Sequence, residues 1–150
     1  MCVFSIVSVP LDPVGNVSLA LEIVILFLLI LGLPLVRSRD NRRNLVWHGY
    51  LTTIAVALHT VLIIIVMIPV FTGGFGELTG LSLFYSVTVW SHEVFGIMAE
   101  ILGVFLVMSW LSRGTSRMTC MKRKKWMLPT FIIWTVAIVN GALVHILGML

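Results

Sequence analysis

Apolar residues fill four long stretches of the chain, and polar residues separate these stretches from one another. The stretches are Val17–Val36, Leu45–Phe71, Leu81–Leu111 and Leu128–Leu150. Each is long enough to cross a hydrocarbon core, which takes about 20 helical residues. The runs are too long for barrel strands, and backbone groups cannot stay unpaired in lipid. The pattern therefore predicts an all-α integral membrane protein, with residues 1–150 forming a single membrane domain and Pro129 in the first turn of the fourth helix.

The basic residues predict how the helices are oriented in the membrane. All ten lysines and arginines lie in the loops that follow the first and third apolar stretches. Short loops rich in Lys and Arg stay on the cytoplasmic side. We therefore expect a four-helix up-down bundle with both basic loops inside and both chain termini outside.

The composition agrees with a membrane protein and changes the interpretation of the positive charge. Hydrophobic residues make up 59% of the chain and charged residues only 11%, and the mean hydropathy is +1.11. Soluble domains contain about half apolar and a quarter charged residues. The formal net charge is +4, but the basic residues flank the spans. Anionic lipid headgroups of the inner leaflet are therefore the expected partner, and nucleic acid is not.

Polar side chains within the spans are the candidates for function. The histidines are His48, His59, His92 and His145. At a rise of 1.5 Å per residue, the last three lie about 24–31 Å from the nearest basic loop, whereas His48 lies about 8 Å from it. Ionisable residues at such depth are costly and usually mark a functional site. We expect three histidines from three helices at a similar level in the outer half of the membrane.

Carboxylate and amide side chains share this depth. They are Glu22, Glu93, Glu100 and Asn140, at about 20–30 Å from the inner side. Buried carboxylates beside imidazoles pair with them, carry protons or coordinate metals. These residues are candidates for accepting protons or contacting a quinol.

Glycines accompany two of the histidines. Gly96 and Gly103 follow His92 along one face of the third helix, and Gly141 precedes His145 on the fourth. Small residues allow transmembrane helices to approach closely. They would equally leave room for a flat macrocycle beside an imidazole, and the sequence leaves both interpretations open.

Three kinds of site fit these residues. A haem b needs axial imidazoles and apolar walls, and His59 could pair with His145 or with His92. One haem is expected, and His48 would ligate a second only with a weaker partner. A non-haem metal held by His59, His92 and His145 is the second possibility. The third is hydrogen bonding between helices with no cofactor.

The chain resembles known families over most of its length. It is similar in outline to transmembrane b-type cytochromes, in which bis-histidine haems lie between helices. From about Arg42 to Leu150 it also resembles an uncharacterised four-helix prokaryotic membrane family associated with haem-copper oxidases. That likeness rests on Arg43-x4-His48, His59, His92 and the Lys125-Trp-Met-Leu-Pro129 segment. The family has a histidine after its third span that this chain lacks, since Met118-Thr-Cys-Met-Lys stands there.

The resemblance implies a prokaryotic plasma membrane and a respiratory complex as the setting. We therefore expect a haem b electron-transfer subunit that exchanges electrons with quinol in the outer half of the membrane. An electron-transfer subunit is favoured over a stand-alone enzyme. The alternative is a metal-binding or assembly subunit of a terminal oxidase, and a purely structural subunit is the third hypothesis.

Overall fold

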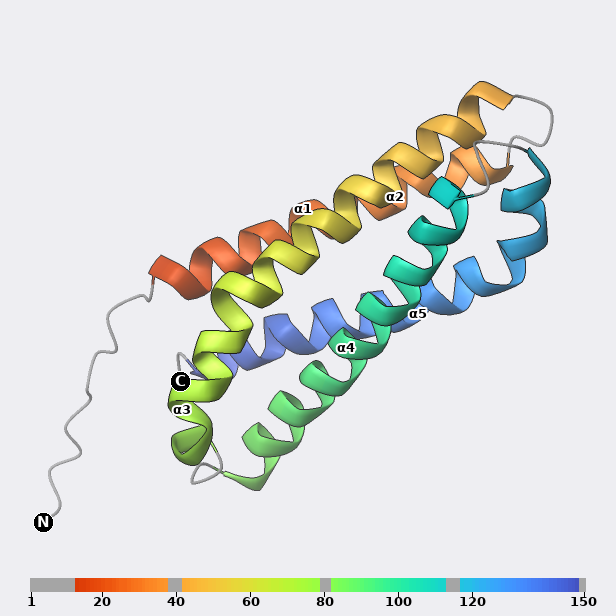
Figure 1. The fold of residues 1–150 in the computed structure, drawn as a ribbon. Coiled ribbons are helices and arrows are strands. Elements are labelled where there is room, and N and C mark those ends of the chain that lie inside the picture. The colour runs from red at the N-terminus through yellow and green to blue at the C-terminus, as the bar shows by residue number, and fades with distance from the viewer. Residues whose placement is uncertain (1–12, 38–41, 79–81, 113–116, 149–150) are drawn as a thin grey trace, which may run out of the picture.

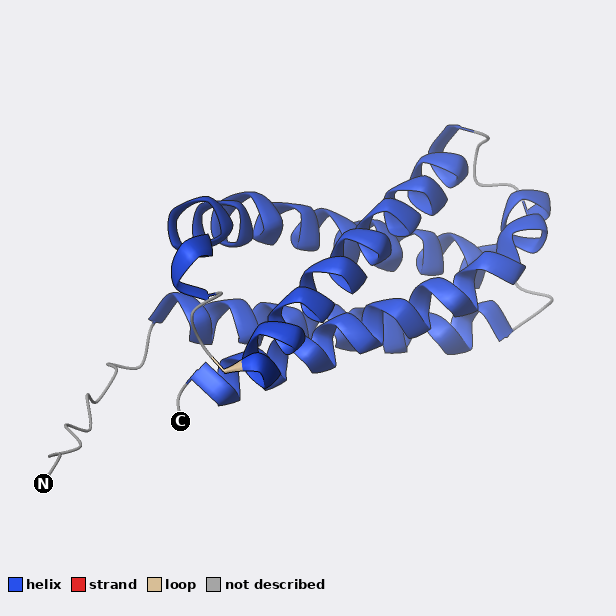
Figure 2. Ribbon diagram, turned by 90° about the horizontal axis from the view of Figure 1, so that it is seen from below, coloured by secondary structure: helices blue, strands red, loops and turns tan. Residues whose placement is uncertain are grey.

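Long helices make up nearly all of the described structure, a computed structural model that covers residues 13–37, 42–78, 82–112 and 117–148 (Figure 2). The helical elements are α1 (Pro13–Arg37), α2 (Arg42–Leu62), η1 (Ile63–Met67), α3 (Ile68–Leu78), α4 (Leu83–Ser112) and α5 (Arg117–Gly148). Within these ranges, four segments are long and apolar enough to cross a membrane: Val14–Val36, Arg43–Gly73, Leu83–Ser112 and Lys125–Leu147. The all-helical class and the four spans expected from the sequence are confirmed.

The largest difference from the expected boundaries is at the start of the fourth helix. The sequence predicted that this helix begins near Leu128, but α5 begins at Arg117. Pro129 therefore lies inside the helix and not in its first turn. The extension follows from composition, because Met, Lys and Arg are all good helix formers. The expected start at Leu81 and the last two residues lie outside the described residues.

The second span changes its helical geometry midway. A π-helix, η1, joins α2 to α3, and the Ile68 N–H bonds to the carbonyl of Ile63 five residues earlier. Pro69 follows directly and has no N–H to donate. Such π-turns contain one residue more than an α-helical turn. The span therefore continues without a break while α3 is rotated relative to α2.

The spans pack beside their neighbours in the chain. Figure 1 shows consecutive spans running in opposite directions, with the start of α1 and the end of α5 at the same end of the molecule. α1 lies against α2, α2 against α4, α4 against α5, and α5 against α1. α2 also touches α5, so the four spans enclose a common interior.

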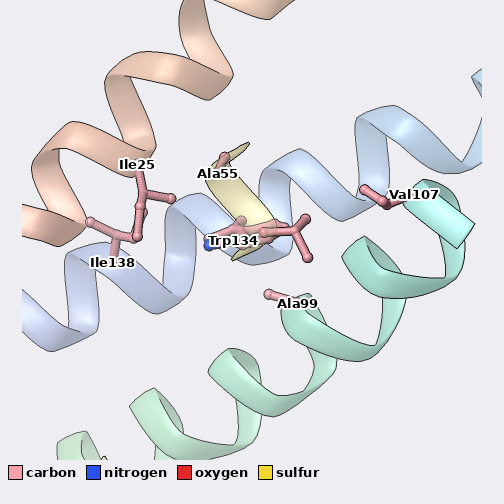
Figure 3. Packing of buried hydrophobic residues seen from close by; sticks show 7 residues of the cluster. Ile25, Ala55, Ala99, Val107, Trp134 and Ile138 are labelled. Carbon is pink, nitrogen blue, oxygen red and sulfur yellow. The ribbon is translucent and has the colours of Figure 1, made fainter. Parts of the chain in front are cut away.

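The interior is built around one large aromatic residue and several small ones. The cluster consists of Ile25, Ala55, Val56, Ala99, Val107, Trp134 and Ile138. Trp134 lies among residues of all the other spans (Figure 3), and only 1% of its surface is exposed. Alanines at the contacts let the helix backbones approach closely. Large apolar side chains are exposed on every span, as expected for a surface that faces lipid.

Gly103 is required by this packing, and Gly96 is not. A Cβ at Gly103 would lie 2.6 Å from Trp134 Cζ3, whereas a Cβ at Gly96 would meet no atom within 4 Å. We expect Gly103→Ala to lower the free energy of unfolding by about 1–3 kcal/mol, the usual cost of overpacking. Gly96→Ala should be neutral or stabilising by up to about 1 kcal/mol, because alanine is the better helix former. Unfolding in detergent with a denaturant series measures both.

A double-mutant cycle separates this clash from a general effect at Gly103. In a Trp134→Phe background the ring atoms that meet the new methyl group are gone. The cost of Gly103→Ala should therefore shrink in that background. If Gly103→Ala lowers the free energy of unfolding equally in both backgrounds, the loss does not come from the contact with Trp134.

Candidate functional site

His59 and Glu100 form a buried pair between α2 and α4. His59 Nδ1 lies 2.8 Å from Glu100 Oε2, and both side chains are largely buried. An ionised carboxylate only accepts hydrogen bonds, so with an ionised Glu100 the His59 Nδ1 carries the proton and donates it. The neutral imidazole then has its lone pair on Nε2. The edge of the ring also contacts Trp134 of α5, at 5.2 Å between ring centroids.

Thr60 provides a second hydrogen-bond partner for Glu100. Its hydroxyl contacts Glu100 Oε1 and also lies 2.9 Å from the carbonyl oxygen of Val56. A hydroxyl has one proton and two acceptor lone pairs. The hydroxyl donates this proton to Glu100 when the carboxylate is ionised, and its lone pairs can accept a proton from Glu100 when the carboxyl is neutral. The arrangement therefore accommodates Glu100 in its neutral as well as its ionised form.

His92 is held by α5 and faces Glu22 of α1. Its Nδ1 lies 2.9 Å from the carbonyl oxygen of Ala137 and must donate, because a carbonyl only accepts. Its Nε2 lies 4.0 Å from Glu22 Oε1, too long for a direct hydrogen bond. A Cβ at Gly141 would lie 2.7 Å from Glu22 Oε2 and 2.8 Å from His92 Cε1, so glycine is needed there.

Two buried polar atoms have no hydrogen-bond partner in the described part of the protein. They are Glu22 Oε2, an acceptor, and Trp134 Nε1, a donor. Glu22 is only 4% exposed. Such orphaned groups are rare in folded proteins and call for an explanation, such as a water, an ion or a functional role.

The other two histidines mark the two ends of the molecule. His48 Nδ1 lies 3.0 Å from the carbonyl oxygen of Gly32, which joins α2 to α1 near the basic loops. His145 Nε2 lies 3.1 Å from Asn16 Oδ1, which joins α5 to α1 at the opposite end. Glu93 and Asn140 are half-buried and lie outside these pairs.

The deep polar residues form separate pairs in the described part of the protein. Within the described ranges, no three His, Cys, Asp or Glu residues lie close enough to hold a metal ion. His59, His92 and His145, the expected metal ligands, are thus not gathered into one group in these ranges. The reason is that the three imidazoles are bonded to different neighbours: His59 to α4, His92 to α5 and His145 to α1.

The glycines also differ from one another. Trp134 fills the space beside Gly103, and Glu22 with His92 fills the space beside Gly141. At these two positions the glycines serve close packing. Gly96 is buried yet has open space at its Cβ position, one turn from both His92 and Glu100.

The sequence analysis did not identify several residues of the site. Thr60, Trp134, Asn16 and the carbonyl groups of Gly32 and Ala137 were not singled out. Trp134 offered a signal, because Trp47, Trp110 and Trp126 all lie near the basic loops while Trp134 lies deep in its span. The carbonyl partners offered none, since every residue has one.

Comparison of the chain with protein-family models, with curated proteins and with solved structures found no match. The site must therefore be interpreted from its own geometry.

Proposed function

We propose that the chain is a haem b electron-transfer subunit of a respiratory membrane complex. It forms an up-down bundle in a prokaryotic plasma membrane, with both termini outside and the basic loops on the cytoplasmic side, where they contact anionic lipid. This setting agrees with the resemblance to the four-helix family associated with haem-copper oxidases.

The observation that carries the proposal is the orientation of two deep imidazoles. His59 and His92 each have Nδ1 next to an oxygen acceptor, at 2.8 and 2.9 Å. Haem and metal ligands are typically held in this way, because a hydrogen bond from Nδ1 fixes the tautomer and the ring and leaves Nε2 to bind the iron. They come from α2 and α4, which lie side by side.

The neighbouring residues fit a haem in their chemistry. A Cβ at Gly96, between His92 and Glu100 on α4, would meet no atom within 4 Å, and the apolar cluster of the interior would supply walls for a haem. His59 and His92 would hold the haem iron, and the haem would supply one-electron transfer when bound. His145 is bonded to Asn16 and is not assigned to the haem.

The carboxylates would handle the protons that accompany quinol oxidation. Glu100 has a hydrogen-bonding partner for either protonation state in Thr60, and Glu22 has an unpaired oxygen facing the interior. A quinol that gives up electrons must also give up protons, and both carboxylates lie beside a proposed ligand. These side chains would hold the protons in a region without bulk water.

A reduced-minus-oxidised visible spectrum of the purified full-length chain, produced with ample haem supply, tests the proposal. We expect a b-type α-band and about one haem per chain by pyridine haemochrome, as for a single bis-histidine site. Two haems per chain would indicate that His48 is a ligand of the second. A chain with no haem would contradict the proposal, and copper or iron found in its place would favour the metal-binding or assembly subunit.

A further inference from the structure

An arginine and two aromatic residues lie along one face of α2 where the second span begins. They are Arg43, Trp47 and Tyr50, spaced by four and three residues, so they are neighbours on the same helix face. Trp47 and Tyr50 are each more than half exposed, and Arg43 is exposed as well. We call these three residues the entry face of α2, which points away from the interior of the bundle.

The two rings of the entry face are held in place by α4. Trp47 and Tyr50 meet edge to face, with 6.4 Å between ring centroids. Tyr50 meets the buried Trp110 of α4 in the same way at 5.5 Å. Trp110 can lie this close to α2 because a glycine stands opposite it, and a Cβ at Gly49 would clash with its ring. Three rings thus run from the interior to the surface in a fixed arrangement.

The entry face covers the depth at which lipid headgroups lie. The second span begins at Arg43, and at helical rise Trp47 lies about 6 Å and Tyr50 about 10 Å further along. The headgroup region of a bilayer is about 5–8 Å thick on each side. Side chains of a helix lean toward its N-terminus, so the indole and the phenol lean back toward the level of Arg43. Their N–H and O–H groups can therefore reach phosphate and ester oxygens of a lipid.

The charge around the entry face selects the kind of lipid. All ten lysines and arginines lie in the loops after the first and third spans, where Asp40 is the only acidic residue. A guanidinium is always charged, and its planar fork matches the oxygens of a phosphate. Basic residues attract an anionic headgroup, whereas they repel the choline of a zwitterionic lipid. An anionic phospholipid is therefore complementary to this face.

We infer that one anionic phospholipid binds to the entry face of α2, with its phosphate between the guanidinium of Arg43 and the hydroxyl of Tyr50. The indole N–H of Trp47 donates to an ester oxygen of the same lipid. The acyl chains continue along α2 over Ile54 and Val61, which are exposed on the same face. This is a defined site for a single lipid, beyond the general attraction of the basic loops to the membrane surface, and it does not depend on haem.

Native mass spectrometry of the purified full-length chain tests the site. The protein is equilibrated in detergent with equal amounts of phosphatidylglycerol and phosphatidylcholine, and the lipids that remain on the chain are counted. We expect about one retained phosphatidylglycerol per chain. It should be preferred over phosphatidylcholine at least about fivefold, the factor expected from one basic residue beside an anionic headgroup.

Arg43→Gln should lower the ratio of phosphatidylglycerol to phosphatidylcholine about fivefold. The matched control is Lys125→Gln, which removes the same charge from an exposed residue of α5. Lys125 lies about 200° around the helix from Met127, which packs against Leu45 and Trp110. It therefore faces away from the entry face, and its loss should change the ratio less than about twofold because of screening.

Tyr50→Phe keeps the ring against Trp110 and removes only the hydroxyl. Hydrogen bonds to charged groups are the stronger ones, so the retained amount of both lipids should fall at least about threefold. The same change in Tyr85→Phe, near the start of α4, should leave the retained amount unchanged.

Equal retention of the two lipids by the wild-type chain would overturn the site and leave this face to another subunit. Equal losses in Arg43→Gln and Lys125→Gln would overturn it as well, because the lipid would then respond to net charge alone. Unchanged retention in Tyr50→Phe would overturn the placement of the phosphate. The counts are made on chains with and without haem, so a failure of the haem proposal leaves them standing, and a lack of lipid preference leaves the haem proposal intact.

Discussion

Replacing His59 with alanine is expected to abolish haem binding. The variant loses the proposed ligand atom Nε2 and leaves Glu100 without its imidazole partner. Loss of the residue that hydrogen-bonds to a ligand typically costs 10–100-fold in metal affinity, and loss of the ligand itself should cost more. Haem content of the purified variant should fall below about a tenth of the wild-type value. Pyridine haemochrome analysis measures it directly.

Two further variants make this experiment specific. Glu100→Gln keeps the shape of the side chain and should reduce haem retention by about 10–100-fold in affinity while leaving a b-type spectrum. His48→Ala removes an imidazole that bonds to Gly32 and should retain full haem content. If His59→Ala keeps a full haem complement with an unchanged spectrum, the ligand assignment is wrong.

Removing the indole of Trp134 is expected to give the largest loss of stability. Trp134 is almost fully buried and contacts Gly103 and His59. Truncating a buried Trp to Ala costs about 3–5 kcal/mol in soluble proteins. In a membrane the transfer term is smaller because lipid is as apolar as the core, so we expect about 2–3 kcal/mol. Denaturant unfolding in detergent measures the difference.

Trp126 is the matched control on the same helix. It is 44% exposed, and Trp126→Ala should change stability by less than about 1 kcal/mol, as expected for a position outside the core. A loss at Trp126 as large as that at Trp134 would show that the packing around Gly103 does not hold the spans together.

The four spans could be predicted because span formation depends on local composition. Length and hydropathy decide whether a segment crosses a membrane, and both are properties of consecutive residues. The prediction that Pro129 lies in the first turn of its helix was wrong for a related reason. Hydropathy marks where the hydrocarbon core begins, but the helix itself extends to Arg117 through the basic residues.

The partners of the polar residues could not be predicted, because they depend on how each helix is rotated. The depth of His59, His92 and His145 followed from counting residues, but their different directions did not. His59 bonds to Glu100, and His92 bonds to a backbone carbonyl. The roles of the glycines could not be predicted for the same reason. A glycine that packs against a tryptophan and a glycine beside open space look identical in the sequence.

The π-turn of the second span bears on which insertions and deletions the chain can accept. The Ile63–Met67 segment holds one residue beyond α-helical spacing. Deleting a single residue there would restore a regular helix, and the change in phase would fall on α3, beyond His59. The same deletion within α2 would turn every following side chain by about 100° and would carry His59 away from Glu100. Homologues that differ in length should therefore accommodate the difference at this turn.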